Sequence, residues 1–257
     1  MGPDWDVVRP ALVRVLAIRN APRVEGPHPV EFLWAVHDDL PAEAYPAGVA
    51  PALTHIRGTA AFPGGTGLVI EADTAGELPP FPSGGVMVIA RDLDAEDKYL
   101  QRARSGRPHG DPRFPLAYWR SLYRTFERAG LDPRRCFFTN LYVGLRTGSS
   151  PSGPFPGRKN PPFVRWCHAF LELQAEYLRP RLVVFLGNDA RKAYKVPGGV
   201  LTRVRLGAHE GPAVGLAHPS PHHLTARARR YGGFAGPEAE VALLRDAVAQ
   251  MDEPAAP

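Results

Sequence analysis

The sequence has 257 residues, of which 44% are hydrophobic and 22% charged, a balance typical of a soluble globular protein with one large domain or two small ones. No run of about 18 apolar residues occurs, which argues against a membrane span. The two cysteines, Cys136 and Cys167, share no metal-binding spacing and predict a reducing, cytoplasmic setting, and the net charge of +5 mildly favours an anionic partner.

The first 80 residues carry weaker signals than the rest. Residues 5–18 predict an amphipathic helix rather than a signal peptide, because charged residues interrupt the apolar ones. Residues 67–72 (GLVIEA) form a candidate edge strand. We therefore expect a single domain over 1–257, in which residues 1–80 are an N-terminal extension and residues 85–248 the core.

Four short apolar runs predict strands buried on both faces, as in a parallel sheet. They are Val86–Ala90, Cys136–Leu141, Leu182–Leu186 and Ala213–Ala217. Amphipathic stretches at 116–129, 163–178 and 237–251 predict helices between and after them. This alternation predicts a three-layer α/β/α sandwich around a central four-stranded parallel sheet with right-handed crossovers.

Polar residues follow three of these strands. Asp92 comes after the first run, Asn140 lies in the second, and His218 ends the fourth. Because ligands bind at the carboxyl ends of parallel strands, we expect the three side chains to share one rim. Taken singly, Asp92 is also explained as a helix cap, Asn140 as a loop residue and His218 as a core histidine.

The fourth run leads into HPSPHH, which holds three histidines within six residues. Prolines restrict the backbone on both sides of Ser220, so this segment predicts a rigid turn that fixes His218 as a proton donor.

These segments together resemble the uracil-DNA glycosylase superfamily. The resemblance rests on a carboxylate after the first strand, FTNL at 138–141, RPRLVVFLG at 179–187 and HPSP at 218–221, and it covers about residues 85–248. It implies a uracil-DNA glycosylase-like fold and removal of uracil from DNA. Some branches of this superfamily carry an iron-sulfur cluster on four cysteines, and two cysteines exclude those branches by number.

The chemistry of base removal suits the same residues. Breaking the glycosidic bond gives the sugar oxocarbenium character and leaves an anionic base. Asp92 would stabilise the cation and orient a water, while His218 would donate to the uracil O2. Asn140 offers one donor and one acceptor to the O4 and N3 edge of uracil.

A base within a duplex must swing out before it can react, and an aromatic ring then stacks on it. Phe114 is the first candidate for this ring and Tyr99 the second; Phe114 is equally well explained as a hydrophobic staple of the following helix. Family members often insert an apolar wedge after HPSP, a place that implies Leu224 or His222 here.

Further contacts to DNA are expected from basic and polar residues. Candidates that could clamp or position phosphates are Ser220, Arg227, Arg229 and Arg230, with Arg158 and Lys159 as weaker ones. A solvated basic helix start explains the arginine run equally well.

The chain departs from the family pattern directly after Asp92. Leu93 and Asp94 stand where the best-known members have proline and a tyrosine that excludes thymine, so the resemblance does not imply that thymine is excluded. Asp94 and Glu96 add negative charge, and either is an alternative working carboxylate.

We therefore expect a monomeric, monofunctional DNA glycosylase that acts on uracil-containing DNA, with other deaminated bases as further candidate substrates, and that needs neither metal nor cofactor and contacts no membrane. One alternative is a non-catalytic nucleic-acid-binding relative of the same fold. Another is a small-molecule α/β enzyme that uses Asp92 and His218 on a nucleoside.

Overall fold

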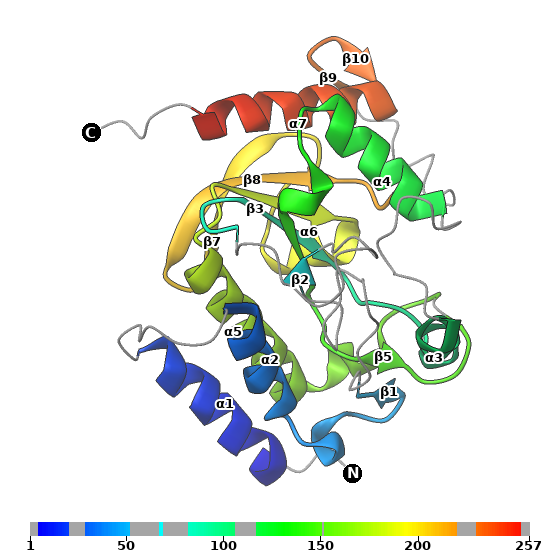
Figure 1. Cartoon of the computed structure of the whole chain (residues 1–257), viewed down its shortest axis with the longest axis vertical. Helices are drawn as coiled ribbons and strands as arrows, with labels where there is room; N and C mark the ends of the chain where they lie inside the picture. The colour runs from blue at the N-terminus through cyan, green and yellow to red at the C-terminus, as the bar shows by residue number, and fades with distance from the viewer. Residues whose placement is uncertain are drawn as a thin grey trace.

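A computed structural model describes residues 5–20, 29–51, 67–68, 82–105, 117–150, 152–219 and 230–252. These residues form a mixed sheet covered by helices on both faces (Figure 1). The strands are β1 (Val49–Ala50), β2 (Gly67–Leu68), β3 (Val86–Ala90), β4 (Cys136–Asn140), β5 (Leu145–Arg146), β6 (Leu182–Leu186), β7 (Leu201–Leu206), β8 (His209–Leu216), β9 (Arg230–Tyr231) and β10 (Phe234–Ala235). The α-helices are α1 (Trp5–Arg19), α2 (Pro29–Asp38), α3 (Glu96–Ser105), α4 (Ala117–Arg128), α5 (Pro161–Leu178), α6 (Asn188–Ala193) and α7 (Pro237–Asp252), and short 3₁₀ turns are η1 (Ala42–Ala44), η2 (Pro133–Arg135) and η3 (Pro156–Lys159).

The central sheet has the strand order β2-β4-β3-β6-β8-β7. Its four inner strands are parallel, as the apolar runs predicted. The two outer strands, β2 and β7, are antiparallel to their neighbours and extend the four-stranded sheet at both edges. The α/β/α fold class expected from the sequence is therefore confirmed.

Successive residues of the inner strands enter opposite hydrophobic layers. In β3, Met87 and Ile89 pack with α1, α2 and α5, while Val86 and Val88 pack with α4 and α7. This alternation follows from the two-residue period of a strand, and it explains why these strands are apolar throughout. Figure 1 shows the two helical layers on opposite sides of the sheet.

Helix α5 forms the centre of one layer and begins where its sequence favours a start. The Asn160 side chain accepts a hydrogen bond from the Phe163 amide at 3.2 Å, and Pro161 occupies the first turn. The helix ends at Leu178, and its C-cap Arg179 has a left-handed φ of 48° and is followed by Pro180. α5 is thereby placed directly before β6.

The N-terminal helix packs on α5. The Arg19 guanidinium donates to Glu176 at 2.6 Å and to Glu172 at 2.9 Å, and Val8 and Val15 are fully buried in the layer. α1 therefore contributes to the core of the described structure. None of the described helices is long and apolar enough to cross a membrane.

Most boundaries lie close to their predicted positions, with one clear difference. β8 begins at His209 rather than Ala213, because residues 209–214 pair with β7 in an antiparallel hairpin that was not predicted from the sequence. The polar alternation of β7 reflects an edge strand with one exposed face. The candidate edge strand at 67–72 is seen as β2 at Gly67–Leu68, and residues 69–72 lie outside the described part of the chain.

Candidate active site

The polar residues predicted from the sequence gather at one edge of the sheet. Ala90 pairs with Asn140, Ile89 pairs with Phe185, and Leu186 pairs with Leu216, so the carboxyl ends of the four parallel strands are level. The chain passes from β3 to β4 on one side and then to β6 on the other, which makes the gap between β3 and β6 a topological switch point. Asp92 follows β3 directly at this point.

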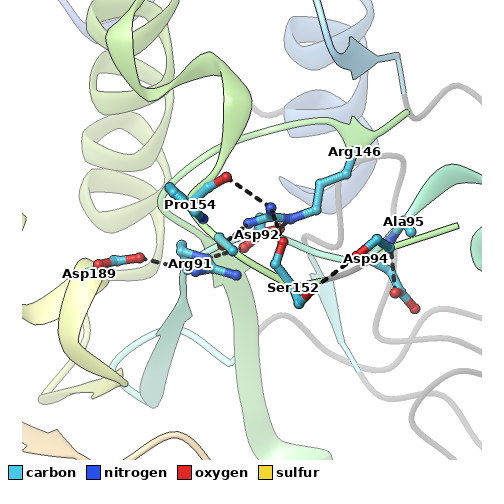
Figure 2. A network of polar contacts seen from close by, with 10 residues as sticks. Arg91, Asp92, Asp94, Ala95, Arg146, Ser152, Pro154 and Asp189 are labelled. Carbon is cyan, nitrogen blue, oxygen red and sulfur yellow. Dashed lines mark hydrogen bonds and ion pairs between the residues drawn. The ribbon is translucent and has the colours of Figure 1, made fainter. Parts of the chain in front are cut away.

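Asp92 is held by two arginines (Figure 2). Its Oδ2 accepts from Arg146 Nε at 2.6 Å, and its Oδ1 accepts from Arg91 Nε. The side chains of Arg146 and Asp92 are only 4% and 5% exposed. The carboxylate is therefore fixed in orientation and charge-balanced by two arginines that were not predicted from the sequence.

Arg91 extends this network across the switch point. Its Nη1 lies 3.2 Å from Oδ2 of Asp189, which belongs to the first turn of α6 after β6. Burial of the Arg91 guanidinium disfavours its charge, but the carboxylates of Asp92 and Asp189 outweigh burial and raise its pKa above the usual value. Arg91 therefore stays charged and links the ends of β3 and β6.

Arg146 also fixes the Pro-Gly-Ser loop that precedes α5. Its terminal nitrogens donate to the carbonyl oxygens of Ser152, Gly153 and Pro154, each at 3.0 Å, and its guanidinium lies 5.7 Å from the Phe155 ring centre. Arg146 was not among the residues predicted from the sequence. The available signal was an arginine that closes the otherwise apolar run LYVGLR, with no acidic neighbour in sequence to pair with it.

Asn140 is buried at the end of β4, and the chain after it stays bonded to the segment that carries Asp92. The Leu141 amide donates to the Ala90 carbonyl at 2.8 Å, and the Tyr142 amide donates to the Arg91 carbonyl at 2.9 Å. The backbones that carry Asn140 and Asp92 are thus held side by side.

His218 is half-buried beside Gly187, the residue that follows β6. The Gly187 amide donates to the Leu216 carbonyl at 2.9 Å, and a Cβ added to Gly187 would lie 3.3 Å from that of His218. Gly187 has a φ of 83°, so glycine both permits this turn and leaves room for the imidazole. One residue earlier, the Ala217 amide donates to Glu240 Oε1 of α7 at 2.7 Å, which anchors the end of β8.

The structure also places Asp94, the alternative carboxylate, and Tyr99, the second candidate for the stacking ring. Asp94 is buried, and its Oδ1 accepts from the Ala95 amide at 2.8 Å. The Tyr99 ring is buried in a small apolar cluster with Ala50 and Leu145, and burial raises the pKa of its hydroxyl. This packing favours a core role for Tyr99 over base stacking.

The residues expected to contact DNA fall mainly outside the described part of the chain. This holds for Phe114, Ser220, His222, Leu224, Arg227 and Arg229. Arg230 is exposed on β9, and Arg158 and Lys159 are exposed in η3.

The two cysteines lie on opposite faces of the sheet and are buried. Burial raises the pKa of both thiols, that of Cys167 to about 12. Among the described residues, no group of three or more His, Cys, Asp and Glu side chains is placed to hold a metal ion.

Comparison with known protein families gives a match over much of the chain. A family model described as the uracil DNA glycosylase superfamily matches residues 94–242. The match includes Asn140 and His218 and begins two residues beyond Asp92. A search of curated proteins finds no match.

Proposed function

Because the match covers more than half of its 257 residues, the chain belongs to the uracil-DNA glycosylase superfamily, and on this premise we propose that it hydrolyses the N-glycosidic bond of uracil in DNA. Membership supports DNA glycosylase chemistry and a DNA partner in general. The choice of uracil, the monofunctional reaction and the residue roles are the proposal.

The proposal is supported mainly by the alignment of the carboxyl ends of β4, β3, β6 and β8 along one edge of the sheet. Neighbouring strands lie about 4.8 Å apart, so the ends of β4 and β8 are separated by roughly 14 Å, with β3 and β6 between them. Asn140 and His218 therefore flank the segment that bears Asp92. An extruded base between them would meet an amide on one side and an imidazole on the other.

In this arrangement His218 donates to the base as negative charge develops on it, and Asn140 reads its hydrogen-bonding edge. Asp92 acts as a fixed anion beneath the sugar. Each carboxylate oxygen has two acceptor sites, and the two arginines use one on each oxygen. The remaining sites are available to orient the attacking water.

The same two arginines favour one alternative function. Two guanidiniums beside Asp92 offset the negative charge that an oxocarbenium ion requires, which suits a nucleic-acid-binding relative without catalysis. Catalysis and binding therefore have to be measured on the same protein.

The test is incubation with a uracil-containing oligonucleotide, followed by alkali. We expect strand scission at uracil, and we expect His218→Ala to reduce its rate by about 10²- to 10³-fold, because a positioned donor to the departing base is lost. Asp92→Asn should by itself remove most of the wild-type activity. Urea titration should check that this variant is folded, because the substitution breaks the ion pair with Arg146.

Absence of cleavage by a wild-type protein that shifts the same oligonucleotide on a gel would establish the binding function instead. Cleavage that survives both substitutions would assign the chemistry to other residues.

A further inference from the structure

A basic groove runs between α4 and α7, apart from the polar network at Asp92. Its volume is about 410 Å³. The lining residues are Arg120, Ser121, Arg124, Thr125 and Arg128 of α4 with Pro237 and Val241 of α7. The two helices lie next to each other over one face of the sheet (Figure 1).

The arginines of the groove form one row along α4. Arg120, Arg124 and Arg128 are spaced by four residues, so their side chains follow one helix face at intervals of about 6 Å. The opposite face of α4 is buried in the core through Trp119, Leu122 and other apolar residues. The row is therefore not required to pack α4 on the sheet.

The charge of this groove is positive. None of the described residues that line it is acidic. Arg120 and Arg124 are exposed, and within the described residues neither forms an ion pair. Arg128, in contrast, is paired within the described part of the chain, because its Nη1 donates to Glu238 Oε1 at 2.9 Å. Two guanidinium groups thus face solvent with their donors available.

The groove adjoins the candidate active site through α7. Pro237 and Val241 form one wall, and Glu240 between them accepts from the Ala217 amide at 2.7 Å. Ala217 immediately precedes His218. The end of the groove formed by the first turn of α7 is therefore fixed to the backbone that positions His218.

We propose that this groove binds the sugar-phosphate backbone of DNA beside the reacting nucleotide, an inference that rests on the proposed function. Guanidinium groups bind phosphates through paired, charge-assisted hydrogen bonds. A row of them contacts successive phosphates of a strand without reading its sequence, which suits a protein that must hold DNA around any uracil.

The test measures affinity for a duplex oligonucleotide without uracil, by fluorescence anisotropy at several salt concentrations. Replacing both Arg120 and Arg124 by Ala should weaken binding about tenfold or more at physiological salt and reduce the salt slope by about two, because two phosphate contacts are lost. Far-UV circular dichroism and the urea midpoint should be unchanged, since both side chains are exposed and alanine favours helix.

Two single variants sharpen the result. Glu238→Gln removes the partner of Arg128 and should tighten binding several-fold with a steeper salt slope. Arg203→Ala is the matched control, because it removes an exposed arginine from edge strand β7, beyond β8, and should change the affinity by less than twofold.

The proposed DNA-binding role of the groove would be overturned if the double variant kept wild-type affinity for DNA. It would also be overturned if the double variant lost only as much affinity as Arg203→Ala does. If wild type binds DNA through these arginines but never cleaves at uracil, the proposed glycosylase activity fails while the DNA-binding role of the groove is supported. If the double variant cleaves and binds DNA as wild type does, the glycosylase activity is supported while the DNA-binding role of the groove fails.

Discussion

At the scale of single residues, the position of Asp92 and the charge of its surroundings have separate causes. Its place after β3 brings it to the switch point of the sheet, but its charge is matched by Arg146 and Arg91, and Arg91 also pairs with Asp189. The candidate active site is therefore nearly neutral and strongly ordered. An oriented carboxylate of this kind is suited to fixed electrostatic stabilisation more than to proton abstraction.

Asn140 carries the prediction about base choice. Replacing it by Asp puts an acceptor in place of the amide donor, so the edge presented by cytosine becomes the better match. We expect the ratio of cytosine to uracil removal to rise, at a large cost in total rate. Cleavage of oligonucleotides that contain one base or the other measures this ratio, and an unchanged preference would remove Asn140 from base recognition.

At the scale of elements, Arg146 joins the distant segment after β3 to β5 and to the loop that follows β5. It lies in β5, pairs with the segment after β3, and holds the loop before η3 through three carbonyl oxygens. A buried guanidinium whose three nitrogens all donate hydrogen bonds stabilises this arrangement only as a set, because each partner would be costly to bury alone.

Arg146→Ala should therefore lower the free energy of unfolding by about 3 to 5 kcal/mol, since it leaves Asp92 buried without its main partner and frees the loop carbonyls. Urea titration measures this loss, with Arg205→Ala on β7 as an exposed control. A double-mutant cycle with Asp92→Ala should show strong coupling, and additive losses would contradict the pairing.

At the scale of the whole molecule, the layer of α1, α2 and α5 carries half-buried histidines that affect acid stability. Burial lowers the pKa of His168, which stacks on Tyr194 at 5.4 Å between ring centres, and burial also lowers that of His209. The unfolded chain thus takes up protons on these groups at a higher pH than the folded chain does.

Their contribution to stability is complete above the unfolded pKa of about 6.5 and is lost as the pH falls below it toward the lower folded values. We expect the unfolding free energy to decrease between pH 7 and 5, by at most about 1.4 kcal/mol per pH unit for each proton taken up. His168→Phe should reduce this slope in urea titrations at a series of pH values. A slope equal to that of wild type would show that His168 does not contribute.

Much of this architecture was predictable from the chain. The four inner strands, the helices α4, α5 and α7, and the common edge of Asp92, Asn140 and His218 follow from apolar runs, helical periodicity and strand order. Local propensity and burial pattern are recorded within a few residues of sequence, so they can be read without a structure.

The contacts that decide how the site works were not predictable in this way. Arg146 lies 54 positions from Asp92, and Glu238 lies 110 positions from Arg128. No short-range pattern records such pairs, because they exist only once the sheet and its helices have brought distant segments together. The sequence alone therefore determined the fold class and the edge of the sheet that carries Asp92, Asn140 and His218, while the tertiary structure decided the charge at Asp92 and the course of the basic groove.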